Sequence, residues 1–245
     1  MSTAADFHAC WRVLPVSNLD TIIGNGTCLV LAPHPDDESL GCGGLIAACV
    51  AADRAPLVAF LTDGAGSHAG SRAYPPARLR TVRAQEAREA AAALGLPAHR
   101  LVFLEQPDTA APHHGPAFDA VVAKLLTLVR QEAACTAIVA PWRHDPHCDH
   151  EAAAIVAAAV AGTVGIRSVA YPVWGWTLPA DTALPEAPGA GWRLDVAAFL
   201  AAKRRAIQAH RSQFGGLITD DPNAFSLPAD LLSIFDSPCE TFLAA

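Results

Sequence analysis

The chain has 245 residues, of which 52% are hydrophobic and 17% are charged. This length and composition indicate one folded globular domain and exclude a disordered or fibrous protein. The net charge is −7 and no long run of Lys or Arg occurs, which argues against a nucleic-acid partner because phosphate binding requires cationic side chains.

The cysteines and the first residues of the chain predict where the protein resides. There are seven cysteines, an odd number with no CxxC pair, and several lie in apolar runs. This usage is typical of a reducing compartment, so we expect a cytoplasmic protein. We expect no signal peptide and no membrane span, because no apolar stretch approaches the required ~20 residues. Nothing in the sequence indicates the oligomeric state.

Short aliphatic runs alternate with helical patterns along the chain. Strands are predicted at residues 27–32, 57–62, 101–104, 137–140 and 169–173, and helices at 43–52, 77–94, 117–132, 150–161 and 196–211. This alternation predicts an α/β fold, a Rossmann-like three-layer sandwich with a mostly parallel central sheet. We expect a single domain over residues 1–245, with its core at about 27–213. Residues 175–192 are expected to form a long loop and residues 214–245 an irregular tail.

The first predicted strand is followed directly by His34-Pro35-Asp36-Asp37-Glu38. Ligands of open α/β sheets bind at the carboxyl ends of the strands. An imidazole and three carboxylates within five residues are costly unless a cation holds them, and His and Asp are both good zinc ligands. The alternative is a helix N-terminus, where carboxylates cap the backbone and interact with the dipole. This segment alone leaves both interpretations open.

A second polar cluster follows the predicted strand 137–140. Residues 144–151 contain three His, two Asp and one Glu, a density that core packing does not explain. Because this strand also ends at the carboxyl edge of the sheet, the two clusters together favour a shared metal centre. His144 and Asp145 are expected in a solvated loop, the usual place of charged loop residues.

The His-Pro-Asp-Asp-Glu run at 34–38 and the His-x-Asp-His run at 147–150 together resemble the LmbE-like, or PIG-L, family of zinc-dependent N-deacetylases. Further matching pieces are residues 61–64, the Arg83-x-x-Glu86 pattern, and the final helix with Lys203, His210, Ser212 and Gln213. The resemblance extends over about residues 27–213.

The resemblance implies that one Zn²⁺ per chain is bound by His34, Asp37 and His150. Two histidines and one carboxylate leave a coordination position open, which is typical of a catalytic zinc site. Asp36 would act as the general base. No dinucleotide cofactor is expected, because the glycines at 41–44 do not complete the fingerprint.

The same resemblance implies that His147 stabilises the tetrahedral intermediate and that Asp149 supports it. The implied activity is removal of an N-acetyl, or another N-acyl, group from an amino-sugar-containing small molecule or glycoconjugate. Alternatives are a metal-dependent phosphoesterase, which would need more converging carboxylates, and a non-catalytic sugar-binding protein on the same fold.

Three further residues are candidate substrate contacts. His68 and Arg72 follow the second predicted strand and could meet a sugar hydroxyl or phosphate, although an ordinary polar loop would contain the same residues. Trp174 follows the fifth predicted strand and could stack on a sugar ring, with core packing as the alternative.

Overall fold

The computed structural model describes residues 2–132 and 134–245. Within this part of the chain, eight strands form one sheet. In sheet order they are β2 (Val16–Ser17), β9 (Gly191–Asp195), β10 (Cys239–Ala244), β7 (Arg167–Tyr171), β6 (Cys135–Pro141), β3 (Thr27–Ala32), β4 (Leu57–Thr62) and β5 (Leu101–Gln106). The five strands from β7 to β5 are parallel, and β10 runs antiparallel to β7 and β9. The predicted mostly parallel α/β sheet is confirmed.

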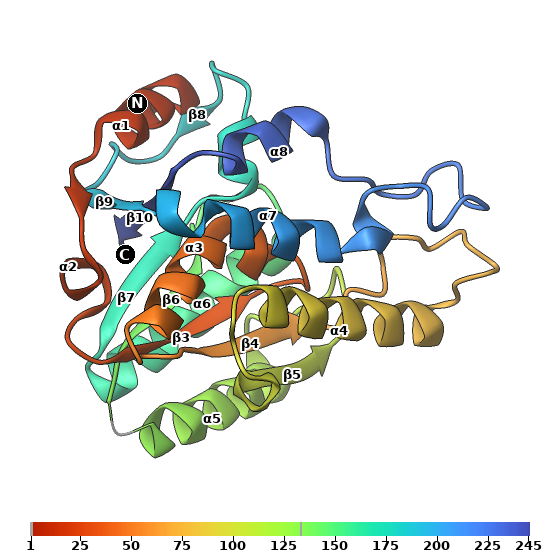
Figure 1. The fold of residues 1–245 in the computed structure, drawn as a ribbon, viewed down its shortest axis with the longest axis horizontal. Helices are drawn as coiled ribbons and strands as arrows, with labels where there is room; N and C mark the ends of the chain where they lie inside the picture. Colours follow the sequence, from red (N-terminus) through yellow and green to blue (C-terminus); the bar gives the residue numbers. More distant parts are fainter. Residues whose placement is uncertain (1, 133) are drawn as a thin grey trace.

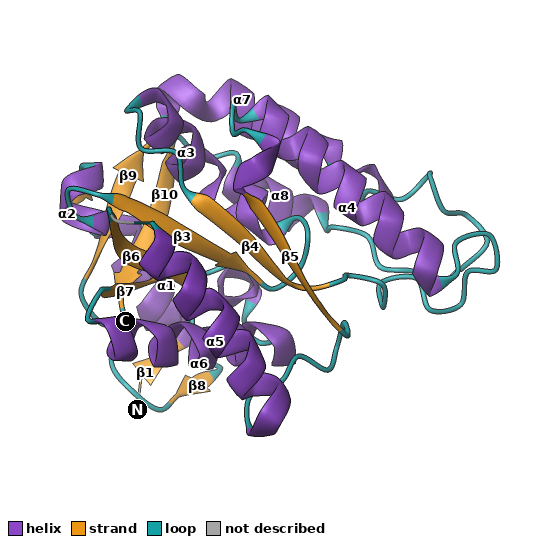
Figure 2. Ribbon diagram, turned by 90° about the horizontal axis from the view of Figure 1, so that it is seen from below, coloured by secondary structure: helices purple, strands orange, loops and turns teal. Residues whose placement is uncertain are grey.

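Helices cover both faces of this sheet (Figures 1 and 2). On one side lie α3 (Asp37–Ala51), α4 (Pro76–Ala93) and α7 (Leu200–Ala209), and on the other α5 (Gly115–Gln131) and α6 (Cys148–Val164). A hydrophobic core lies on each side of the sheet, and successive residues of β3 point into the two cores alternately. Val30 packs into the core on the first side, and Leu29 and Leu31 pack into the core on the second. Strands buried on both faces read as continuous apolar runs, which is why β3 and β4 could be located in the sequence.

None of the helices in the described ranges has both the length and the apolar character needed to cross a lipid bilayer.

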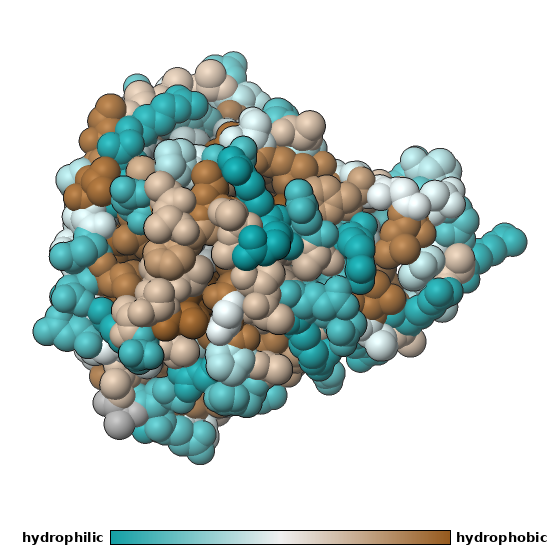
Figure 3. Space-filling view, in the orientation of Figure 1, coloured by the Kyte–Doolittle hydropathy of each residue, from teal (hydrophilic) through white to brown (hydrophobic). Residues whose placement is uncertain are grey.

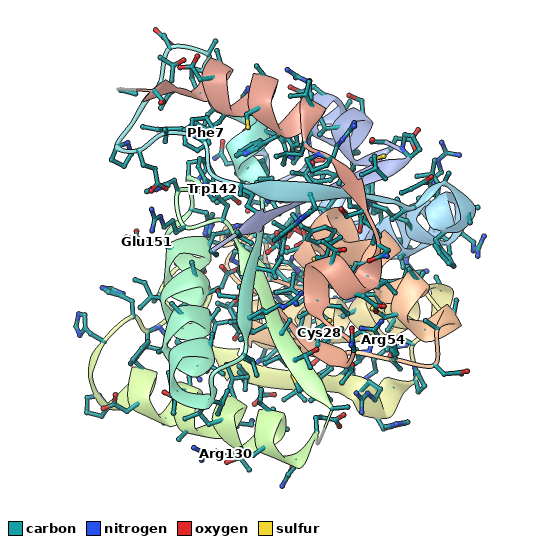
Figure 4. All side chains as sticks on the ribbon, turned by 90° about the vertical axis from the view of Figure 1, so that its left-hand side faces the viewer. Phe7, Cys28, Arg54, Arg130, Trp142 and Glu151 are labelled. Carbon is teal, nitrogen blue, oxygen red and sulfur yellow. The ribbon has the colours of Figure 1, made fainter. Side chains whose placement is uncertain are left out.

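The N-terminal segment packs on the loop that follows β6. Helix α1 (Ala4–Val13) begins with a capping box in which Thr3 and Asp6 exchange hydrogen bonds. Its Phe7 lies against Trp142, with ring centroids 5.2 Å apart (Figure 4), and Trp11 packs on the same Trp142 ring with centroids 5.0 Å apart. Helix α2 (Leu19–Ile23) then leads into β3, and β1 (Ser2–Thr3) pairs with β8 (Ala183–Leu184).

The helix predicted to begin at residue 43 begins at Asp37 instead. Glycines disfavour a helix interior, which hid its first turns in the sequence. Close packing explains why glycines stand here. A Cβ at Gly41 would lie 2.2 Å from the ring of Tyr171, and one at Gly44 would lie 2.4 Å from Val196.

The prediction of an irregular tail over residues 214–245 is wrong in its second half. Residues 229–235 form α8 (Ala229–Phe235), and β10 lies inside the sheet between β7 and β9. The buried Glu240 in this strand obscured the apolar pattern that marks an interior strand. The predicted loop at 175–192 holds only short elements, among them β8 and part of a 3₁₀ turn, Trp174–Thr177.

Two loops, residues 64–75 and 214–228, run side by side and project from the molecule at the right of Figure 1. Asp220 joins them by accepting hydrogen bonds from the backbone N–H groups of Arg72 and Ala73 at 2.8 and 2.9 Å and from the hydroxyl of Ser71 at 2.6 Å. We call them the paired loops. Their far end carries hydrophilic side chains (Figure 3).

Candidate metal centre

The sheet order places a crevice at the carboxyl ends of β3 and β6. These strands are neighbours, but the chain continues from β3 to β4 and β5 on one side and from β6 to β7 on the other. Such a reversal of strand order is where open α/β sheets bind ligands. Residues 34–38 leave β3 and residues 144–150 follow β6, so the two clusters meet in this crevice.

Asp37 lies between the two histidines that were predicted to share a metal with it. Its Oδ2 is 3.1 Å from Nδ1 of His34 and 3.3 Å from Nε2 of His150, and all three side chains are buried. Ligand atoms at tetrahedral positions about 2.1 Å from zinc are about 3.4 Å apart. The spacing of these atoms therefore suits a common ion.

The Nε2 atom of His150 shows whether these residues fit a metal ion. It is buried and has no hydrogen-bond partner. The other ring nitrogen, Nδ1, lies 2.7 Å from Oδ2 of Asp145. Because a carboxylate only accepts, Nδ1 keeps its proton, so the proton on Nε2 is the one that a metal ion would displace. A buried Nε2 with no hydrogen-bond partner, 3.3 Å from a carboxylate oxygen, fits a zinc ligand set.

A third histidine, His147, lies close to His34 and His150. A ring nitrogen of each of His34, His147 and His150 lies within 4.8 Å of the others. Their ring centroids are 4.7 to 5.5 Å apart. His147 is therefore close enough to contact either the ion or a molecule bound to it.

Asp145 was expected in a solvated loop, and this prediction is wrong. Its carboxylate is buried and accepts hydrogen bonds from the backbone N–H groups of Val173, Trp174 and Gly175, as well as from His150. The turn after β7 needs an acceptor for these groups, and Asp145 meets that need while it orients the histidine. His144 is half-buried and lies 2.8 Å from Glu186.

We predict that Asp145→Asn lowers zinc affinity about 10–100-fold, because a carboxylate behind a metal-binding histidine fixes its tautomer and ring orientation. A competition titration against a chromophoric chelator measures this affinity. Asp181→Asn is the matched control, because Asp181 is exposed and does not line the cavity. Equal zinc affinity of the Asp145 variant and the parent protein would contradict this role.

Several carboxylates surround His34 and His150 in this site. Burial lowers the pKa of His34, but hydrogen bonds to Asp108, Asp149 and Asp37 outweigh burial and hold that pKa well above its usual value. Burial likewise lowers the pKa of His150, yet its carboxylate neighbours raise it to about 9. The potential that stabilises protonated imidazoles here would also stabilise a divalent cation.

Asp36 points into the crevice from an unusual backbone conformation. Its φ of 147° and ψ of −31° lie in a region that non-glycine residues rarely adopt, and its N–H donates to Oε2 of Glu38 at 2.9 Å. Its side chain makes no capping hydrogen bond to α3, which removes the helix-cap interpretation for this residue. Instead its Oδ2 lies 3.1 Å from Nη2 of Arg83. Burial raises the pKa of Asp36 to about 6, although the guanidinium of Arg83 opposes this shift.

His147 and Asp149 are connected differently from the expectation. The backbone N–H of Asp149 donates to Nδ1 of His147 at 3.2 Å, so a neutral His147 carries its proton on Nε2. Burial, with the charges of the neighbouring histidines, lowers the pKa of His147. The carboxylate of Asp149 instead accepts from Nε2 of His34 at 3.0 Å and from the N–H of Thr109 at 2.7 Å.

A cavity of about 350 Å³ opens onto this centre, and His34, Asp36, Asp37 and His147 line its inner end. The rest of the wall combines the apolar side chains of Leu40, Trp174, Phe225 and Leu227 with Gly66 and the polar residues Ser67, Arg83, Asp108, Thr109, Gln213 and Asn223. Part of this wall comes from the paired loops, which the sequence did not connect with the site.

Of the three candidate substrate contacts, only Trp174 lines this cavity. His68 is buried behind the wall, with its Nδ1 2.9 Å from the hydroxyl of Ser67. Arg72 is exposed on the paired loops. Asp108, which no motif of the sequence indicates, lines the cavity 3.2 Å from Nε2 of His34. Its one signal was an acidic residue beyond the end of β5.

The chain matches one protein-family model and several solved structures. Residues 29–161 match the family model PIG-L, described as GlcNAc-PI de-N-acetylase. No curated protein sequence matches the chain.

Three solved structures illustrate the structural similarity. The N,N'-diacetylchitobiose deacetylase of Pyrococcus horikoshii is 21% identical, with a TM-score of 0.63 over 93% of this chain and 80% of that one. The conserved protein TT1542 of Thermus thermophilus is 30% identical, with a TM-score of 0.56 over 76% and 79%. The 4-carboxy-2-hydroxymuconate hydratase of Pseudomonas putida is 20% identical, with a TM-score of 0.57 over 75% and 78%.

Proposed function

The chain belongs to the PIG-L family of GlcNAc-PI de-N-acetylases, and from this membership we propose that it is a zinc-dependent amide hydrolase. It would remove an N-acetyl, or another N-acyl, group from an amino-sugar-containing small molecule or glycoconjugate. The observation that carries the proposal is the buried, unpartnered Nε2 of His150, 3.3 Å from Asp37 at the inner end of an open cavity.

We assign the zinc ligands as His34, Asp37 and His150. A bound zinc ion would supply a Lewis acid and lower the pKa of a water molecule to about 7. Asp36 lies beside the ligand Asp37 and lines the cavity without being needed as a ligand. It would accept the proton of the attacking water and return it to the leaving nitrogen.

His147 would stabilise the oxyanion of the tetrahedral intermediate. Because its Nδ1 already accepts the N–H of Asp149, its Nε2–H is the group available to donate. This donation does not require a protonated ring, which agrees with the lowered pKa of His147. Loss of one such donor typically costs about 10²–10³ in rate.

The residues that line the cavity away from the proposed zinc ligands suit a sugar-like substrate. Trp174 and Phe225 form an edge-to-face pair with ring centroids 5.8 Å apart, and Gln213 and Asn223 lie on the same walls. Aromatic faces pack on the apolar face of a sugar ring, while amides can bond its hydroxyl groups.

We predict that Phe225→Ala raises KM for an N-acetyl sugar about fivefold to tenfold and leaves kcat within about threefold, because the ring contacts the substrate body rather than the reacting bond. Steady-state kinetics separates the two constants. Leu217→Ala is the control, because Leu217 is exposed on the same loop and does not line the cavity. A fall in kcat with KM unchanged would contradict this placement.

The proposed reaction is tested by incubating zinc-loaded protein with a panel of N-acetyl sugars and measuring released primary amine. Parallel assays measure phosphate release from phosphate monoesters and hydration of unsaturated acids, since one protein of this fold is a hydratase. Amine release that depends on zinc supports the proposal. Phosphate release or hydration without amine release would reject it, as would sugar binding without turnover.

A further inference from the structure

A second cavity, of about 250 Å³, lies against a different side of α3 from the metal centre. Leu40 lines the first cavity, whereas the next residue, Gly41, lines the second. The second cavity is lined by residues of α1, α7, α8 and the strands β9 and β10, which lie at the upper left and upper centre of Figure 1. None of the proposed zinc ligands lines it.

Cationic side chains dominate this second cavity. Arg12, Arg193 and Lys203 all line it, and within the described chain the single acidic residue on its walls is Glu240. The buried ammonium of Lys203 lies 2.7 Å from Oε1 of Glu240. The three cations and one carboxylate leave a net charge of about +2 on the walls at neutral pH.

The carboxylate of Glu240 is already fully engaged. Beside Lys203, it accepts hydrogen bonds from the backbone N–H groups of Gly44 at 2.6 Å and Leu45 at 2.8 Å. It therefore anchors α3 to β10, and its negative charge is paired with the ammonium of Lys203.

The two arginines have no carboxylate partner among the described residues, whereas Arg54 and Arg204 pair with Asp20 and Asp236. Nε of Arg193 donates to the carbonyl of Leu14 at 2.8 Å, which leaves its two terminal amino groups for another acceptor.

Arg12 extends over Trp176, with its guanidinium carbon 5.9 Å from the ring centroid. Two guanidinium groups and an ammonium on the walls of one cavity repel each other, and an anion placed between them would relieve that repulsion.

We propose that this second cavity binds a small organic anion, a phosphate or carboxylate group attached to an apolar body. The anionic group would be held by Arg12, Arg193 and the free N–H groups of Lys203, since guanidinium groups bind such oxyanions through paired hydrogen bonds. The apolar body would pack against Trp176 and Trp11, which line the walls together with Phe235.

Isothermal titration calorimetry of the zinc-loaded, full-length protein with phenylphosphonate tests this proposal, because phenylphosphonate carries both features and cannot be hydrolysed as an ester. We expect one phenylphosphonate per chain and no binding of phenol. Arg12→Gln and Arg193→Gln should each weaken binding at least about tenfold. Benzoate in a parallel titration distinguishes the two anion types: tighter binding of benzoate indicates a carboxylate ligand, and tighter binding of phenylphosphonate indicates a phosphate.

Arg204→Gln is the matched control, because it removes the same charge from the position next to Lys203 outside the cavity, and it should bind phenylphosphonate like the parent protein. His150→Ala should also bind like the parent protein, which separates this site from the zinc centre. Parent-like binding by both the Arg12 and Arg193 variants, loss of binding in His150→Ala, or no binding of either anion to the parent protein would overturn the proposal. Arg12 is exposed on α1, so its variant should keep the parent's circular dichroism spectrum.

Discussion

Asp36→Asn is expected to lose nearly all turnover, about 10²–10⁴-fold, while it still binds zinc like the parent protein. An amide cannot accept the proton of the attacking water, and the proposed ligands His34, Asp37 and His150 are unchanged. The measurement is kcat on an N-acetyl sugar together with the zinc content of the same preparation.

Two checks make this prediction specific. Asp181→Asn makes the same carboxylate-to-amide change at an exposed residue that does not line the cavity, and it should keep full activity. The thermal unfolding of the Asp36 variant should also be recorded, because Arg83 loses a buried partner at 3.1 Å. If the folded, zinc-loaded Asp36 variant works at close to the parent rate, the base is another residue.

His150→Ala is expected to lose both zinc and activity. The substitution removes the unpartnered Nε2 and also leaves the buried carboxylate of Asp145 without its imidazole partner. Elemental analysis after dialysis should find about one zinc per parent chain and little in the variant.

His144→Ala is the control for that experiment, because His144 belongs to the same segment but pairs with Glu186 away from the proposed ligands. It should keep its zinc. Full zinc occupancy in the His150 variant, at the affinity of the parent protein, would show that this imidazole is not a ligand.

The central strands and the two polar clusters could be predicted from the sequence for one physical reason. A parallel strand buried on both faces is an uninterrupted apolar run, as in residues 27–32 and 57–62, and the polar residues directly after it must lie at the carboxyl edge. This pattern places the segments 34–38 and 144–151 at that edge, whereas the choice of His34 and His150 within them came from the family resemblance.

The features that could not be predicted from the sequence depend on contacts between segments far apart in the chain. Glu240 interrupts the pattern of β10, yet it is buried because it bonds Lys203 and two N–H groups of α3. Asp145 looks like a loop residue until the turn after β7 supplies its donors. Phe225 lines the cavity from the paired loops, which are joined by Asp220 and by the bond from the N–H of Phe225 to the carbonyl of Ser67.

Anomalous diffraction at the zinc absorption edge, from crystals of zinc-loaded protein, tests the central claim most directly. One strong peak should lie about 2.0–2.2 Å from His34, Asp37 and His150, with no other protein carboxylate closer than Asp37. A peak bound by other residues, or none in the crevice between β3 and β6, would contradict a metal shared by these two distant segments.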